Sequence, residues 1–234
     1  MLTAPQFLPA NLASFRERIA AAERAAGRQP QSVTLVGVTK TRPAEVIVEA
    51  RAAGLTDFAE NYVQEAAPKL AAVPRAGTQW HFIGQLQANK TRPVAEGFDW
   101  VHTVDRLRLA ERLSAQRAFH GNPLQVLIQV KLAEEPAKSG VTPAELPELA
   151  AAVATLPHLR LRGLMCVPPE SEDASVQRGY FAQLRRLRDD LNARGLGLDA
   201  LSMGMSADFE AAILEGATHI RIGTALFGTR ARPA

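Results

Sequence analysis

Cysteine is nearly absent from this sequence, and its scarcity excludes a fold held together by disulfides. Cys166 is the single cysteine among 234 residues, so no intrachain disulfide can form and the fold needs no oxidising compartment. The sequence also lacks an apolar run near the roughly 20 residues that a membrane-spanning helix requires. Residues 1–10 contain no basic stretch followed by an apolar core, so we expect no signal peptide. These absences predict a soluble, cytoplasmic protein that does not contact a membrane.

Concentrated charge and clustered metal ligands are missing as well. The 27 Lys and Arg residues and 24 Asp and Glu residues leave a formal net charge of only +3. A small positive excess suits anionic small molecules and does not require nucleic acid, and no run of basic residues or zinc-finger spacing indicates such a partner. The five histidines show no metal-ligand spacing. We therefore expect neither a nucleic-acid partner nor a metal site.

The sequence does contain a regular alternation of short apolar runs and helical patterns. Hydrophobic residues make up 47% of the chain, which is enough for a large core. Residues 33–38 form a β-rich run typical of a strand buried on both faces, and a helical pattern over 44–53 follows a break at 41–43. The other expected strands are 57–59, 80–83, 100–103, 125–131, 159–166, 200–203 and 219–222. Eight such units predict an α/β fold, one (β/α)8 TIM barrel that spans residues 1–234 as a single domain.

Two further signals support this architecture. The absence of a GxGxxG pattern after the first strand disfavours an open, doubly wound sheet. Asn11 suits the N-cap of an extra N-terminal helix, and the apolar stripe that follows consists of Leu12, Phe15, Ile19 and Ala22. Thr142 and Glu145 have the spacing of a capping box, which predicts the start of a later helix.

Lys40 is the first candidate for chemistry. In barrels of this kind, functional groups lie at the carboxyl ends of the strands and in the loops that follow, and Lys40 directly follows the first apolar run. Partly apolar surroundings disfavour the charged form of a lysine amine. A neutral amine can attack an aldehyde and form a Schiff base. The alternative at this position is a solvated loop lysine.

The segments after the seventh and eighth strands form a second candidate, a phosphate site. Met205 and Ser206 precede an expected helix over 207–214, and a helix N-terminus offers free N–H groups and partial positive charge. Ser206 is equally suited to be an ordinary N-cap. Gly223 and Thr224 offer a backbone amide and a hydroxyl beside the same helix, and phosphate sites often use these two loops. Arg221 lies close by, where it would point inward or form an ion pair.

Several motifs in the chain resemble those of a known family. They are Val38-Thr-Lys40, Glu60-Asn-Tyr-Val-Gln-Glu65, Trp80-His-Phe-Ile-Gly84, Lys138-Ser-Gly140, Arg162-Gly-Leu-Met165, Leu201-Ser-Met-Gly-Met-Ser206 and Arg221-Ile-Gly-Thr224. In this order, over nearly the whole barrel, they resemble the YggS/PROSC family of pyridoxal phosphate homeostasis proteins. One departure is Ala59, where the family usually has glycine, and we expect the added methyl group to shift the loop that carries Asn61.

The resemblance implies a barrel of the alanine racemase N-terminal-domain type that binds pyridoxal 5′-phosphate through a Schiff base on Lys40. The other cofactor-binding residues that it implies are Asn61, Met205, Ser206, Arg221, Gly223 and Thr224. It places Arg221 against the pyridine nitrogen of the cofactor. Because arginine only donates hydrogen bonds, it leaves the ring a weaker electron sink than a carboxylic acid partner would. Racemases of this barrel type add a second acid/base residue from another domain, and we expect none after residue 234.

Three functions remain open on this basis. The one we favour is a pyridoxal 5′-phosphate carrier or buffer in intracellular vitamin B6 homeostasis. It would have no catalytic turnover, act as a monomer and contact recipient apo-enzymes only transiently. The second is a stand-alone amino-acid racemase with Tyr62 or His81 as its base, and the third is a barrel for another phosphorylated metabolite. Lys90, Lys131 and Lys138 would assist cofactor transfer, unless they are ordinary solvated lysines.

Overall fold

Parallel strands form the centre of the molecule. The computed structural model describes residues 8–117, 122–134 and 139–228. Within these ranges, eight strands pair in chain order and β8 pairs with β1, which closes the barrel. The strands are β1 (Thr34–Val38), β2 (Asp57–Glu60), β3 (Gln79–Phe82), β4 (Trp100–Val104), β5 (Leu124–Gln129), β6 (Leu159–Met165), β7 (Ala200–Ser202) and β8 (His219–Ile222). The predicted TIM barrel and its eight strands are confirmed, with small differences at strand ends.

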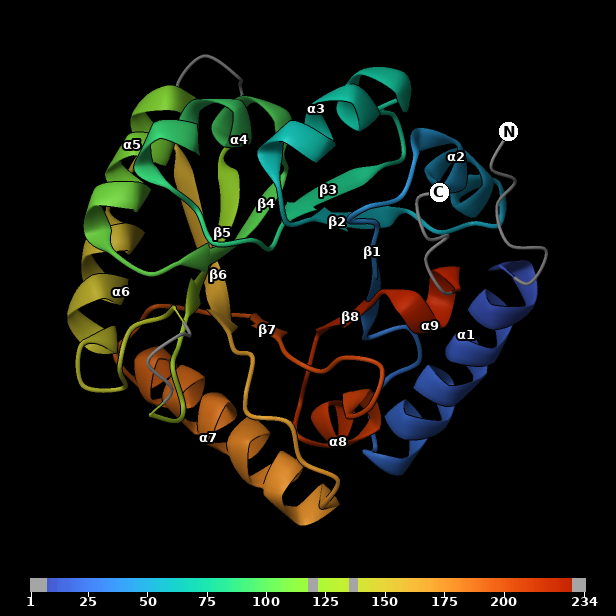
Figure 1. Cartoon of the computed structure of the whole chain (residues 1–234). Coiled ribbons are helices and arrows are strands. Elements are labelled where there is room, and N and C mark those ends of the chain that lie inside the picture. Colours follow the sequence, from blue (N-terminus) through green and yellow to red (C-terminus); the bar gives the residue numbers. More distant parts are fainter. Residues whose placement is uncertain (1–7, 118–121, 135–138, 229–234) are drawn as a thin grey trace.

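Helices surround the barrel, as Figure 1 shows. In the described part of the chain they are α1 (Leu8–Ala25), α2 (Ala44–Ala52), α3 (Val63–Ala72), η1 (Ala88–Lys90), α4 (Thr91–Gly97), α5 (Leu107–Arg117), α6 (Leu146–Ala154), α7 (Ala174–Ala193), α8 (Phe209–Leu214) and α9 (Thr224–Phe227). The extra helix α1 packs beside α8, where the rings of Phe15 and Phe209 lie 5.6 Å apart. The helix expected before the barrel is therefore present.

The two helix-start predictions have different outcomes. The apolar stripe of α1 is buried as expected, but α1 begins at Leu8 and Asn11 lies inside it. The Asn11 Nδ2 group donates to the Leu226 carbonyl (3.1 Å), so the N-cap prediction for Asn11 is wrong. The reciprocal contacts of the capping box are present, because the Thr142 N–H donates to the Glu145 carboxylate (3.0 Å) and the Glu145 N–H donates to the Thr142 hydroxyl (3.3 Å). The helix α6 itself begins later than the box predicts, at Leu146, with Glu145 as its N-cap.

Alternation along each strand separates two buried regions. Side chains on a strand point to opposite faces in turn, so in β8 Ile220 and Ile222 face the helices while His219 and Arg221 face the barrel interior. The layer between strands and helices contains the main apolar core. The interior contains a smaller apolar cluster, which consists of Trp100, Leu127, Met165 and Ala200, and the polar side chains of the candidate site lie beside it.

Candidate functional site

The barrel brings the predicted site residues to neighbouring strand ends. In the closed order of strands, β7, β8, β1 and β2 lie side by side. The site residues that follow these strands at their carboxyl ends are Met205 and Ser206 after β7, Gly223 and Thr224 after β8, Lys40 after β1, and Asn61 after β2. Segments far apart in the sequence therefore share one end of the barrel, which is the end where such barrels bind ligands.

The backbone on either side of Lys40 is held firmly, whereas its side chain is not. Thr39 donates its N–H to the Ala59 carbonyl (2.9 Å). Thr41 has a positive φ of 63°, a region that non-glycine residues enter rarely, and its N–H donates to the Glu65 carboxylate (2.7 Å). The half-buried Lys40 side chain makes no hydrogen bond or ion pair with the described residues. The strand end therefore presents an amine that is available for a ligand.

A buried ion pair lies directly behind this lysine. The Nζ of Lys69 lies 2.7 Å from Oε1 of Glu60 and donates to the Thr39 carbonyl (2.8 Å). The Thr39 hydroxyl donates to the same carboxylate oxygen (2.5 Å). Burial raises the pKa of Glu60, against the hydrogen bonds from Lys69 and Thr39 that lower it. The pair links α3 to the ends of β1 and β2 and so holds the backbone that carries Lys40.

The loops after β7 and β8 present unused backbone donors. Helix α8 begins at Phe209, so the expected start at residue 207 is wrong, and Asp208 accepts the Met205 N–H (2.6 Å). The backbone N–H groups of Ser206, Gly223 and Thr224 donate to no other described residue. Free amides in these two loops, which follow neighbouring strands, are donors that suit phosphate oxygens.

Gly204 allows this arrangement. Its φ is +95°, and a Cβ atom there would lie 2.7 Å from the Ala212 Cβ. That distance is shorter than real Cβ contacts allow. The glycine therefore lets the loop after β7 pack against α8, and in this loop the Ser206 amide makes no hydrogen bond with another described residue.

Arg221 lies at the floor of the site and is buried, with 4% of its surface exposed. Its Nη1 donates to the Ser202 hydroxyl (2.6 Å) and its Nη2 donates to the Cys166 carbonyl (2.9 Å). Burial lowers the pKa of Arg221 from its usual range, but a guanidinium stays charged in proteins. Its remaining N–H groups make no hydrogen bond within the described chain, so they are available to an acceptor at the strand ends.

Asn61 closes the β2 side of the site. Its Oδ1 atom is buried without a hydrogen-bond partner in the described residues, and an unpaired buried acceptor indicates a missing donor. Gly84 fits against it, because a Cβ at Gly84 would lie 1.9 Å from the Asn61 carbonyl oxygen. A cavity of about 320 Å³ adjoins this loop and is lined in part by Tyr62 and Lys90.

The sequence did not reveal a polar network inside the barrel. Ser202 Oγ lies 2.8 Å from Nδ1 of His102, whose Nε2 lies 2.9 Å from Nδ1 of His81. His81 Nε2 lies 3.0 Å from Oδ1 of Asp57. With Arg221, these four residues form what we call the interior relay. Polar residues at inward positions of five strands were the available signal, but their contacts depend on how the barrel closes.

The other candidate residues have different surroundings. Both ring nitrogens of His81 are engaged, which removes it as a free base for a racemase. Tyr62 is 56% exposed. Lys90 and Lys131 are half-buried, while Lys138 lies outside the described residues.

Cys166 is buried, and burial raises the pKa of its thiol to about 12, so it is inert at neutral pH.

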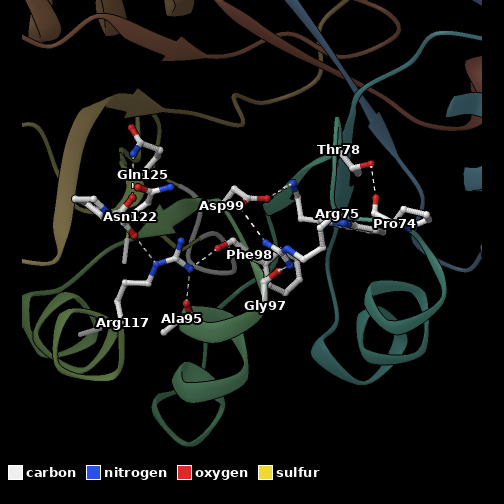
Figure 2. Close-up of polar contacts among 12 residues, drawn as sticks. Pro74, Arg75, Thr78, Ala95, Gly97, Phe98, Asp99, Arg117, Asn122 and Gln125 are labelled. Atoms are coloured by element: carbon white, nitrogen blue, oxygen red, sulfur yellow. Dashed lines mark hydrogen bonds and ion pairs between the residues drawn. The ribbon is translucent and has the colours of Figure 1, made fainter. Parts of the chain in front are cut away.

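The opposite end of the barrel holds a cavity of about 670 Å³ with arginines on its wall. Figure 2 shows the partners of two of these arginines, Arg75 and Arg117. Arg117 donates to the carbonyls of Ala95 and Phe98 (2.6 and 2.8 Å), and Arg75 pairs with Asp99 (2.9 Å). These contacts secure the end of α4 and the start of β4. Arg75 and Arg117 therefore serve the structure, and we place the site at the other end.

The described ranges contain neither a metal-binding cluster nor a membrane-spanning helix. No group of three or more His, Cys, Asp or Glu side chains there has a geometry that could hold a metal ion. None of the helices in those ranges combines the length and apolar character needed to cross a bilayer.

Comparison with known proteins identifies the family. Residues 10–231 match the family described as alanine racemase, N-terminal domain. A pyridoxal phosphate homeostasis protein of Pseudomonas aeruginosa is 56% identical over 94% of this chain and 94% of its own. One from Escherichia coli K12 is 52% identical over 94% of this chain and 95% of its own. The chain belongs to the pyridoxal phosphate homeostasis protein family. The resemblance read from the sequence motifs is thus confirmed.

Solved structures agree with this assignment. PipY of Synechococcus elongatus, in a structure with pyridoxal phosphate bound, is 40% identical with a TM-score of 0.83. That match covers 94% of this chain and all of PipY. Alanine racemase from Corynebacterium glutamicum has a TM-score of 0.67 at 17% identity, and the match covers 62% of its chain. The racemase likeness shows a shared fold alone.

Proposed function

We propose that this member of the family binds pyridoxal 5′-phosphate at the carboxyl ends of β7, β8, β1 and β2 and takes part in vitamin B6 homeostasis. The observation that carries the proposal is the match to homeostasis proteins over 94% of both chains at 52–56% identity. A relative 40% identical over 94% of this chain has the cofactor bound in its structure.

The residues at the strand ends fit the chemical groups of this cofactor. Pyridoxal 5′-phosphate supplies an aldehyde, which condenses with a lysine amine as one water leaves. Lys40 has an amine without a partner in the described chain and is our choice for the Schiff base. The unused amides of Ser206, Gly223 and Thr224 suit the phosphate, with Met205 in the same loop. Asn61 has an unpaired acceptor that suits a cofactor hydroxyl group.

The position of Arg221 favours a protein that holds the cofactor over an enzyme that uses it to turn over a substrate. We place its guanidinium against the pyridine nitrogen, where it donates a hydrogen bond and keeps its own proton. A ring without a full proton is a weaker electron sink for carbanion chemistry. Of the two proposed racemase bases, His81 is buried with both nitrogens engaged. We therefore propose a carrier or buffer that is not an enzyme.

The proposal extends to the domain organisation, oligomeric state, compartment and partners of the protein. We propose that residues 1–234 act as one domain, as a monomer in the cytoplasm, and that the protein meets recipient apo-enzymes transiently. Analytical ultracentrifugation of the purified protein with and without pyridoxal 5′-phosphate tests the monomer. A stable dimer in both samples would contradict it.

Borohydride reduction followed by peptide mass mapping tests the site directly. We expect the added mass on the peptide that contains Lys40, and no reducible visible absorbance in Lys40→Ala. Lys90→Ala is the matched control, since Lys90 is also half-buried near the strand ends. Labelling of another lysine would contradict the site. Robust racemisation, transamination or decarboxylation of an amino-acid panel would contradict the carrier.

A further inference from the structure

The interior relay connects the two ends of the barrel. Asp57, at the start of β2, has a side chain that is 16% exposed and lines a cavity of about 720 Å³ at the amino ends of the strands. Arg221 lies at the carboxyl end of β8. Between them, His81, His102 and Ser202 are fully buried. Because β4 and β7 are not neighbours in the barrel, the 2.8 Å contact between His102 and Ser202 crosses the interior.

The Arg221 end sets the first hydrogen-bond direction. A guanidinium has donors only, so the Ser202 hydroxyl oxygen must accept at the 2.6 Å contact. The hydroxyl hydrogen then needs an acceptor of its own, and the one polar atom within reach in the described chain is Nδ1 of His102 (2.8 Å). If Nδ1 accepts, neutral His102 carries its proton on Nε2.

At the Asp57 end of the interior relay, the last hydrogen bond has the same direction as the first. An ionised carboxylate only accepts, so His81 Nε2 is the donor across 3.0 Å. Because His102 carries its proton on Nε2, Nδ1 of His81 accepts that hydrogen bond at 2.9 Å and carries no proton itself. The two ends thus agree on one pattern, in which every group donates towards Asp57 and each histidine holds its proton on Nε2.

The surroundings support a neutral His102 in this pattern. Burial lowers the pKa of His102 well below 6.5, and the Arg221 guanidinium, like any positive charge on the neighbouring His81 or His219 ring, acts in the same direction. His219 touches the His81 and His102 rings, with centroids 6.0 and 5.9 Å away. Its Nδ1 instead lies 2.8 Å from the Thr218 hydroxyl. His219 is therefore in the same core but outside the relay.

We propose that Ser202 and His102, backed by His81 and Asp57, are positioning residues that hold Arg221 in one orientation toward the ring nitrogen of a bound cofactor. The inference rests on the proposed function, because it assigns Arg221 to that nitrogen. The Ser202 hydroxyl gives the buried Arg221 guanidinium an acceptor with a fixed orientation. From Ser202, hydrogen bonds that all donate in the same direction lead through His102 and His81 to the Asp57 carboxylate at the opposite end of the barrel.

Nitrogen-15 NMR of the histidine rings tests the relay without any cofactor. At pH 7, we expect the His81 and His102 rings to be neutral, with the proton on Nε2 in both. Assignment uses His81→Gln and His102→Gln, each of which removes one set of signals. A proton on Nδ1 of either ring, or a charged ring at this pH, would overturn the directed pattern.

Cofactor binding tests the positioning role. Ser202→Ala removes an acceptor from a buried charged donor. We therefore expect the dissociation constant for pyridoxal 5′-phosphate to be roughly 10- to 100-fold larger in this variant. We also expect a shifted visible absorption maximum, because the Arg221 contact with the ring changes. Ser202→Thr keeps the hydroxyl and should restore both values. His219→Gln changes the same core outside the relay and should leave both near wild type.

The outcomes separate this inference from the proposed function. If the wild-type protein binds no pyridoxal 5′-phosphate, the proposed function fails, whereas the NMR result still decides the relay. If the wild-type protein binds and Ser202→Ala matches His219→Gln in affinity and spectrum, the positioning role is wrong. Circular dichroism identifies variants that fail to fold, in which case Ser202→Thr and Ser202→Cys provide the comparison of hydroxyl with thiol.

Discussion

The two buried regions of this barrel are built from different chemistry. The layer between strands and helices consists mainly of aliphatic and aromatic side chains in one continuous cluster. The interior has a small apolar cluster around Trp100 and Leu127, beside a row of histidine, serine and arginine side chains joined by hydrogen bonds. The same alternating strands supply both regions.

The difference shows how stability and function are divided in this fold. Apolar burial has no direction, so the outer layer stabilises the barrel through area and packing. Buried polar groups must find partners with defined geometry, so the interior orients Arg221. The outer layer also contains buried polar side chains, among them the Glu60–Lys69 ion pair behind Lys40.

Truncation in the outer layer should have the largest effect. Phe58 on β2 is fully buried beside Trp80, with ring centroids 6.0 Å apart. We expect Phe58→Ala to lower the free energy of unfolding by about 3–5 kcal/mol, because it removes apolar contacts and leaves a cavity. Urea unfolding measures this. Leu107→Ala, at a position 37% exposed, is the control and should change the value by less than about 0.5 kcal/mol.

Breaking the buried Glu60–Lys69 ion pair should lower the free energy of unfolding slightly less. Lys69→Met leaves the fully buried Glu60 carboxylate without its cation, which predicts a loss of about 3 kcal/mol in the free energy of unfolding. Neutralising the partner in Lys69→Met/Glu60→Gln should recover part of that loss. Equal stability of the single and double variants would mean that Glu60 is already neutral in the single variant.

Acid should weaken the interior through its histidines. Burial lowers the pKa of His219 from 6.5 to about 3, so the folded state binds fewer protons than the unfolded state between these values. Stability is therefore full above pH 6.5 and falls with pH by up to about 1.4 kcal/mol per pH unit for this group. Urea unfolding at pH 7, 6 and 5 gives the slope. His219→Phe should show a shallower slope than wild type, and an unchanged slope would contradict the assignment.

A surface ion pair provides the smallest expected effect and a baseline for both regions. Arg92 and Glu96 on α4 lie 3.4 Å apart with side chains 64% and 41% exposed. We expect Glu96→Gln to change the free energy of unfolding by less than about 0.5 kcal/mol, since water screens the pair. Thermal unfolding in low and high salt checks this, and a loss above 1 kcal/mol would indicate that α4 depends on the pair.

Much of the fold was predictable because it depends on local periodicity. The apolar run at β1 and the stripe of α1 appear in the sequence at the spacing that their burial requires. The start of α1 was predicted wrongly because Asn11 reaches the Leu226 carbonyl, a partner 215 residues away. The start of α8 was missed because Asp208 accepts from Met205 in a turn that precedes the helix.

By itself, the sequence determined the eight strands, the helix that precedes them, the family and the choice of Lys40, because each is written in short motifs or in neighbouring residues. Only the tertiary structure decided what Arg221 touches. Its contacts come from Ser202 on β7 and from Cys166, which follows β6, and the histidines behind Ser202 meet it across the closed barrel. Closure joins residues that no sequence spacing relates, because the distance across a barrel depends on the packing of all eight strands.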